Sequence, residues 1–241
     1  MTRLPEASTS DHARTESSPT RRRWWRWILG GLVATVVIIV GALAAFIKLS
    51  PSAAPLALPQ GLASAPSGPL SGRWQVAGGS LAGFRVAETA LGLTNYVGGQ
   101  TRAVTGMIVI SGETVSSARF RINLTTVKVS GKTQPQFATS LGTRDHPLAT
   151  FTLTRPATMS SAFASGRTVT VTATGSLAMN GTSRPVTVML TARRDGLELQ
   201  TTGSIPVQFA RWGIKQPAGF GFVGSLANHG EAEFLLIFRR Q

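Results

Sequence analysis

The segment 169–205 constrains the fold of this chain more than any other part of the sequence. Apolar residues occupy every second position in three successive runs, which is the period of a strand with one buried face and one exposed face. Asn180-Gly181 separates the first two runs, and both residues tolerate the positive φ that a tight hairpin needs. Arg194-Asp195-Gly196 is expected to form a second turn. The segment therefore predicts a three-stranded antiparallel meander.

Further strand signals recur along most of the chain after residue 72. Shorter alternating or apolar runs lie at 74–77, 81–89, 103–111, 117–129, 150–154 and 231–239. The stretch 90–99 is glycine-rich and is expected to be turn-like, whereas 130–143 suits a short helix or a compact loop. No stretch after Leu49 has helical periodicity. With about eight or nine strands the predicted class is all-β, a closed barrel or a sandwich. A barrel of about eight antiparallel strands has room inside for its own side chains or for one ligand.

The N-terminal part has a different character. Residues 1–27 form a basic, polar tail that we expect to be disordered and cytoplasmic. The 20 residues 28–47 carry no charge, and about 20 apolar residues are what a helix needs to cross a bilayer. Trp24, Trp25 and Trp27 lie where an aromatic belt belongs, and Arg21-Arg22-Arg23 precede them. Residues 28–49 are therefore predicted to form a single-pass transmembrane helix, with the remainder of the chain outside the cytoplasm.

A cleaved signal peptide is the alternative for this segment, because Ala42-Leu43-Ala44 resembles a small-x-small cleavage site. Signal peptides have apolar regions of about 7–15 residues, shorter than this one. A retained anchor is therefore favoured over secretion after cleavage. Residues 50–71, which contain five prolines, are expected to be a Pro/Ala/Ser linker that holds the domain, residues 72–241, away from the membrane.

Composition limits the possible functions of residues 72–241. The chain has no cysteine and a formal net charge of +14. From Ser71 onward there are 17 Lys and Arg against 7 Asp and Glu, a net of +10. These charges are spread over strands and turns, which favours general attraction to an anionic cell-envelope surface over nucleic-acid binding.

Residues able to perform catalysis or bind a metal are sparse. Asp145-His146 is the one candidate for acid–base chemistry, but adjacent residues of an extended chain face opposite ways. With two histidines in the domain, His146 and His229, and no cysteine, neither a metal site nor a cofactor is expected. Hydrolase activity around His146 stays a minor hypothesis, and the chain is expected not to be an enzyme.

The apolar residues on the inward faces of the predicted strands, and in loops that could cap them, are the candidates for a ligand cavity. An ordinary filled core is the competing interpretation. The candidates are Trp74, Phe84, Val86, Phe120, Ile122, Phe137, Phe151, Val171, Leu177, Val188, Leu190, Leu199, Trp212, Phe220, Phe222, Phe234 and Phe238.

Three segments of residues 72–239 resemble the YceI-like, lipocalin-like family. GFRVAE at 83–88, followed by TRAVTG at 101–106, is one segment. HPLATFTLT at 146–154 is similar to the family's Y-P-x-x-x-F, and GSLAMNGTSRPV at 175–186 is similar to its G-x-L-x-x-x-G-x-x-R-x-V. Two departures are clear: His146 stands where the family prefers Tyr, and 131–137 lacks the family's Arg-Asp pair.

The resemblance implies an extended eight-stranded antiparallel barrel that binds a long isoprenoid or a similar amphiphilic lipid and performs no catalysis. The leading hypothesis is therefore a membrane-anchored, extracytoplasmic lipid-binding barrel of the bacterial cell envelope, with Arg102 or Lys132 as the polar residue at its mouth. The alternative is a filled barrel that uses its basic surface to bind envelope polymers. The expected partners are a lipid-like small molecule and the membrane, not nucleic acid.

Overall fold

The computed structural model describes residues 35, 37–42, 45, 52–90, 92–216 and 224–241. The chain divides into two units, Met1–Phe46 and Ile47–Gln241. Residues 35, 37–42 and 45 of the first unit are helical and exposed. The predicted tail 1–27 lies outside the described residues, and so does most of the predicted transmembrane segment 28–49. Within the described part of the chain, no helix combines the length and the apolar character needed to span a membrane.

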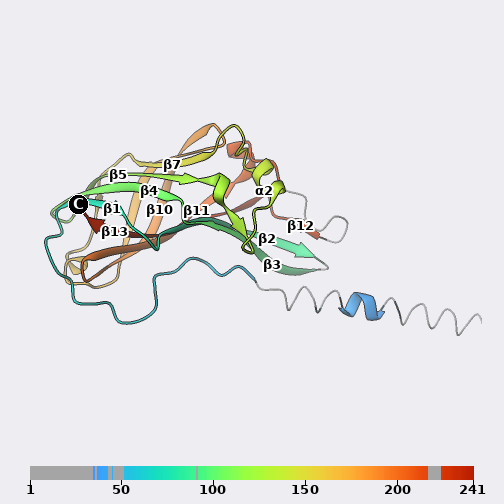
Figure 1. Ribbon diagram of the computed structural model, residues 1–241, viewed down its shortest axis with the longest axis horizontal. Coiled ribbons are helices and arrows are strands. Elements are labelled where there is room, and N and C mark those ends of the chain that lie inside the picture. The colour runs from blue at the N-terminus through green and yellow to red at the C-terminus, as the bar shows by residue number, and fades with distance from the viewer. Residues whose placement is uncertain (1–34, 36, 43–44, 46–51, 91, 217–223) are drawn as a thin grey trace, which may run out of the picture. The chain divides into compact units, whose positions relative to one another are not determined.

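The described residues of the second unit form one sheet of 13 strands (Figure 1). Short helices interrupt it: the α-helix α2 (Pro135–Ser140) and the 3₁₀ helices η1 (Leu124–Thr126), η2 (Ser161–Phe163) and η3 (Phe209–Trp212). The strands are β1 (Gly72–Val76), β2 (Leu81–Ala90), β3 (Leu93–Thr101), β4 (Val104–Ser111), β5 (Thr114–Asn123), β6 (Lys128–Val129), β7 (Leu148–Leu153), β8 (Ala157–Thr158), β9 (Val169–Met179), β10 (Thr182–Asp195), β11 (Glu198–Gln208), β12 (Gly224–Leu226) and β13 (His229–Arg240).

Eight of these strands close into a barrel. The order is β1-β4-β5-β7-β9-β10-β11-β13, and β13 returns to pair with β1 through Trp74↔Arg240 and Val76↔Phe238. All of these pairings are antiparallel. Closure leaves these eight strands without a free edge. The predicted closed antiparallel barrel is confirmed.

The meander that opened the sequence analysis is also confirmed, with one correction. β9 pairs with β10 and β10 with β11 in continuous registers. Asn180 and Gly181 have φ of 47° and 70°, as a two-residue hairpin turn requires. The second turn, predicted at 194–196, lies one residue later, because Asp195 pairs with Glu198 and leaves Gly196-Leu197 as the turn. Gly196 takes the positive φ, 59°.

The prediction of a turn-like stretch at 90–99 was wrong, since 93–101 form the strand β3. It pairs with β2 over Ala82↔Thr101 to Ala90↔Leu93, and this hairpin extends past the closed barrel. Glycine in this hairpin allows neighbouring side chains to pack closely against the backbone. A Cβ at Gly99 would lie 2.6 Å from the Phe84 ring and 2.8 Å from Val127, so a larger residue would displace the aromatic side chain beneath the hairpin.

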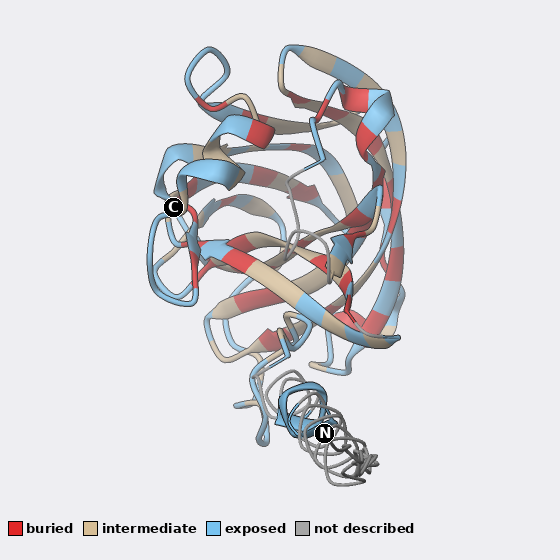
Figure 2. Cartoon of the chain, turned by 90° about the vertical axis from the view of Figure 1, so that its right-hand side faces the viewer, coloured by how far each residue is buried: buried red, intermediate tan, exposed pale blue. Residues whose placement is uncertain are grey.

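Buried and exposed residues alternate along the barrel strands (Figure 2). The inward residues form two apolar clusters. One includes Trp74, Phe163 and Phe238 near the start of β1, and the other includes Val188 and Trp212 nearer to α2. The interior of the barrel is therefore apolar along its length.

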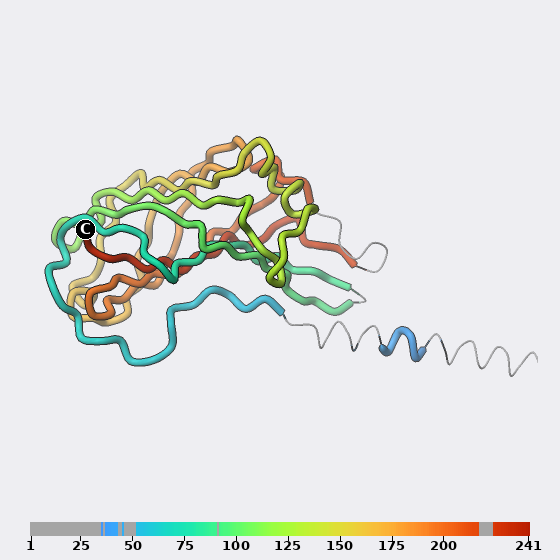
Figure 3. The backbone as a smooth tube through the Cα atoms, in the orientation of Figure 1, coloured from blue at the N-terminus to red at the C-terminus, as the bar shows by residue number. Residues whose placement is uncertain are grey.

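Residues 52–71, which we call the outer strap, run along the outside of the barrel (Figure 3). Close to its start, the Ala53 N–H donates to the Tyr96 carbonyl of β3 at 2.9 Å. In its middle, the Thr202 hydroxyl donates to the Leu56 carbonyl at 2.8 Å. At its end, the Trp74 indole donates to the Leu70 carbonyl at 2.9 Å. The outer strap is thus bound to the wall along its length.

Candidate ligand-binding cavity

The barrel encloses a cavity of about 210 Å³. Its wall comes from the inward faces of β2, β4, β5, β7, β9, β10, β11 and β13. On β11 the lining residues extend from Leu199 to Ile205, a separation that corresponds to about 20 Å at 3.3 Å per residue. The cavity is long and narrow, which suits a single chain better than a compact ring system.

Small side chains explain why the barrel is not filled. Ala118 of β5, Ala149 of β7, Ala173 of β9 and Ala192 of β10 all point inward on neighbouring strands and are at most 8% exposed. A side chain that ends at Cβ leaves the middle of the barrel unoccupied. The phenylalanines Phe120 and Phe151, whose ring centroids lie 6.3 Å apart, line the cavity beside these alanines.

Most of the residues proposed from the sequence lie on the wall of this cavity or of a smaller neighbouring one. Those that line the main cavity are Phe84, Phe120, Ile122, Phe151, Val171, Leu177, Val188, Leu190, Leu199, Phe234 and Phe238. Val86 and Phe137 line the smaller cavity.

The other proposed residues lie elsewhere. Trp74 and Trp212 are each 2% exposed and belong to the packed core rather than to either cavity wall. Phe220 and Phe222 lie outside the described residues. Arg102 and Lys132, the proposed polar mouth residues, are exposed and line neither cavity.

The smaller cavity, of about 60 Å³, lies at the α2 end of the barrel. Phe137 and Ser140 of α2 and Leu226 of β12 contribute to its wall. Phe84, Leu141, Met179 and Ala232 line both cavities. A chain that lies in the main cavity can therefore extend toward α2.

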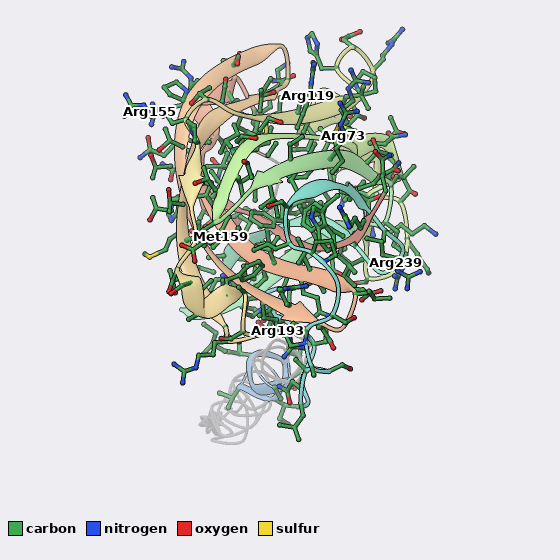
Figure 4. The ribbon with its side chains drawn as sticks, turned by 90° about the vertical axis from the view of Figure 1, so that its left-hand side faces the viewer. Arg73, Arg119, Arg155, Met159, Arg193 and Arg239 are labelled. Carbon is green, nitrogen blue, oxygen red and sulfur yellow. The ribbon has the colours of Figure 1, made fainter. Side chains whose placement is uncertain are left out.

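The opposite end of the barrel is tightly packed. The connection from β7 to β9 carries Met159 and Phe163, which are 5% and 2% exposed and line the inner end of the main cavity. Sequence periodicity could not identify these two residues, because they lie in an irregular loop. Figure 4 views this end and shows Arg73, Arg119, Arg155 and Arg239 directed away from the barrel.

Only a few polar residues in the described part of the chain line the main cavity, namely Gln200, Thr201 and Glu233. Thr201 faces inward, and its hydroxyl donates to the Thr191 carbonyl at 3.1 Å. Glu233 contributes to the wall, but its carboxylate accepts from Arg85 Nε at 2.6 Å and from the Leu56 N–H of the outer strap at 3.2 Å. This hydrogen bond to Glu233 also raises the pKa of Arg85.

One carboxyl near the α2 end was missed by the sequence analysis. Glu88 on β2 is only 9% exposed, and burial raises the pKa of its carboxyl. The two-residue period of β2 places Glu88 on the same face as Phe84 and Val86. That period was visible in the sequence, but an acidic residue at an inward position was not considered.

The candidate residues for catalysis that the structure describes do not converge on the cavity. Asp145 and His146 are exposed and line neither cavity. Among the described residues, no group of three or more His, Cys, Asp or Glu side chains is placed to hold a metal ion. What the arrangement offers is apolar surface inside a closed wall.

An antiparallel eight-stranded barrel around a long apolar cavity defines the class of lipocalin-like binding barrels. The YceI-like domain family matches residues 74–233, and the chain belongs to this family.

Two solved structures are similar to the chain. One is described as a polyisoprenoid binding domain from Saccharophagus degradans implicated in plant cell wall breakdown, with a TM-score of 0.53 and 13% identity over 71% of this chain and 99% of that one. The other is BcnA of Burkholderia cenocepacia, with a TM-score of 0.49 and 18% identity over 64% of this chain and 95% of that one. A search of curated proteins found no match. At 13% identity, the similarity to the first of these structures supports the barrel fold of this chain and nothing beyond it.

Proposed function

We propose that this protein binds one amphiphilic lipid of the isoprenoid type, with the apolar chain inside the barrel and without catalysis. The observation that carries the proposal is the long cavity of about 210 Å³, whose wall is made by apolar side chains of a closed barrel. Burial contributes about 0.8 kcal/mol for each methylene group removed from water. Membership of the YceI-like family and the likeness to a polyisoprenoid binding domain support the same ligand class.

The alternative function, a filled barrel that acts through its basic surface, is less well supported. It needs inward side chains that fill the barrel, and the alanines on four neighbouring strands leave space instead. The lipid proposal is favoured for that reason.

The test is the lipid content of the full-length protein purified in a mild detergent and analysed by native mass spectrometry. We expect one bound lipid per chain. Ala173→Leu inserts a larger side chain into the cavity and should remove most of the bound lipid. Ala178→Leu is the matched control, because Ala178 lies on the outward face of the same strand. Lipid retained equally by both variants, or absent from the wild type, would contradict the proposal.

We also propose that residues 28–49 anchor the barrel to the membrane and place it outside the cytoplasm. The 20 uncharged residues 28–47 and the basic flank on their N-terminal side support this topology. Alkaline carbonate extraction of membranes, with the mass of the extracted protein, tests it. A chain released by carbonate, or one shortened near residue 44, would instead indicate a cleaved signal peptide.

A further inference from the structure

The main cavity ends at a defined level on the barrel wall. Along β10, the inward residues Leu190 and Ala192 line the cavity, whereas Arg194, the next residue on that face, does not. On β9, Val171 lines the cavity and Val169 does not. Ala192 and Val169 are cross-strand partners, so both strands place the end of the cavity at the same level.

Met159 and Phe163 cover this end of the cavity from the connection between β7 and β9. Both side chains line the main cavity, and they are only 5% and 2% exposed. They belong to the same apolar cluster as Ala192 and Val169. Figure 4 views this end of the barrel and labels Met159. We call these two side chains the floor of the cavity.

The segment that carries the floor is held to the barrel by hydrogen bonds of its backbone. The strand β8, directly before Met159, pairs with β5. The Met159 N–H donates to the Glu113 carbonyl at 2.8 Å. The Ser160 hydroxyl accepts from the Ala162 N–H at 3.3 Å and so caps η2, the helix that contains Phe163. Both floor residues therefore lie on backbone whose position is fixed locally.

Arg194 fastens the same segment to the outer strap. Its Nη1 atom donates to the Ala164 carbonyl, and its Nη2 atom donates to the carbonyls of Ser67 and Gly68. The guanidinium is buried, and among the described residues no carboxylate pairs with it. These carbonyls replace its hydration, so moving the segment away would leave a buried charge without acceptors. A bound chain is therefore unable to displace the floor easily.

We propose that Met159 and Phe163 determine how much of the apolar chain of a bound lipid the barrel can bury, and so set the chain length that it selects. The inference rests on the lipid-binding function proposed above and deepens it. The chain lies in the main cavity with its polar end toward α2, where the smaller cavity continues the main one. Each isoprene unit adds buried apolar surface until the tail reaches the floor, and further units add none.

A series of prenyl alcohols tests the proposal: geraniol, farnesol, geranylgeraniol, geranylfarnesol and hexaprenol, each longer than the one before by one isoprene unit. Each is added to the full-length protein, freed of lipid and held in a nonionic detergent, and its dissociation constant is measured by native mass spectrometry. For the wild type, each added unit should tighten binding at least about tenfold until the tail reaches the floor. Beyond that length, within this series, the gain should fall below about threefold, which gives a plateau in affinity.

One pair of matched variants lengthens the cavity or leaves it unchanged. Met159→Ala removes part of the floor, so the first probe beyond the wild-type plateau should gain at least about fivefold in affinity. Met189→Ala makes the same substitution at a residue that is 70% exposed on the outward face of β10. This control should reach its plateau at the same probe as the wild type.

A second pair shortens the cavity or leaves it unchanged. Ala157 of β8 is 5% exposed and lines the main cavity two residues before Met159. Ala157→Leu fills space at the floor, so the plateau should begin one probe earlier. Ala178→Leu adds the same side chain on the outward face of β9 and should not move it. Circular dichroism of each variant reports on folding, and the plateau of the wild type needs no variant.

The possible results separate this inference from the proposed function. If the wild type binds none of the five alcohols, the proposed function fails and this inference fails with it. If affinity continues to rise tenfold per unit through hexaprenol, the cavity has no floor at these residues. If Met159→Ala and Ala157→Leu both reach their plateau at the same probe as the wild type, the two residues do not select chain length. In the last two cases lipid binding stands.

Discussion

The inner wall of the barrel and the outer strap both bury side chains, but the buried groups differ in kind. The wall buries apolar residues such as Val171 and Leu199, 5% and 3% exposed, which need only shape and contact. Beneath the outer strap lie Glu233, Gln200 and Arg194, each 5–6% exposed, which need partners. The two regions therefore differ in what a substitution disturbs: packing contacts on the inner wall, and hydrogen bonds beneath the outer strap.

The partners of Arg194 illustrate the stricter requirement. Its Nη2 atom donates to the carbonyls of Ser67 and Gly68 at 2.9 Å, and its Nη1 atom donates to Ala164 at 3.3 Å. The first two carbonyls belong to the outer strap. A segment rich in Pro, Ala and Ser has few side chains to bury, so its position depends on hydrogen bonds to its backbone. The wall needs no such bonds and can therefore stay hollow.

The largest effect is expected on the wall, at its packed end. Phe163→Ala removes a side chain that is 2% exposed and should lower the free energy of unfolding by about 3–5 kcal/mol. Urea denaturation followed by circular dichroism measures it. Phe137→Ala, on the half-buried face of α2, is the comparison at the other end. Equal losses at the two positions would contradict a packed end and a looser end.

The next largest loss of stability is expected from a substitution beneath the outer strap. Arg194→Ala leaves three carbonyls without their donor and should cost about 1–3 kcal/mol, with faster hydrogen exchange in residues 64–68. Arg167→Ala, an exposed arginine from the neighbouring loop, is the control and should change stability little. A strap that exchanges at the same rate in both variants is not bound through Arg194.

The wall was predictable from the sequence to a degree that the strap was not. The inward positions of β9, β10 and β11 follow from a two-residue period, and Asn180-Gly181 sets the register of the first hairpin. Whether inward residues pack or line a cavity depends on the summed volume across the barrel. That is why Trp74 and Trp212 were proposed as cavity residues although they belong to the core.

The strap and the surroundings of Glu88 depend on contacts between residues far apart in the sequence. Residues 52–71 have no period of their own, and some of their partners, such as Arg194, lie more than 120 positions away. Glu88 sits at an inward position, but its burial depends on β12, which pairs with it from the other end of the chain. Local pattern carries no information about such partners.

A smaller effect on stability is expected at Glu88, a buried carboxyl on the inward face of β2. Because burial raises its pKa in the folded state, the ionised carboxyl opposes folding at neutral pH, and stability increases as the pH falls through the folded pKa toward the unfolded value. Glu88→Gln should therefore stabilise the protein at pH 7, by at most about 1 kcal/mol, and the gain should vanish at low pH. Thermal melts from pH 3 to pH 8 measure this, with Glu113→Gln as the control. A gain that is independent of pH would contradict desolvation as its cause.

The smallest effect is expected at Asp195, where the strap meets the β10–β11 turn. Its carboxylate accepts from the Ser64 N–H at 2.7 Å and from the Gln200 amide at 3.1 Å, and the hydrogen bond from Ser64 is the main cause of its lowered pKa. A carboxyl whose folded pKa is depressed stabilises the fold above its unfolded pKa, and this contribution is lost as the pH falls through the folded value. The wild type should be slightly more stable than Asp195→Asn at pH 6, and the difference should shrink below about pH 4.

Since the Asp195 carboxylate is partly exposed, added salt should weaken this difference in stability. Urea melts of both proteins at several pH values decide the matter, and a difference that grows on acidification would show that the strap is not held through this carboxylate.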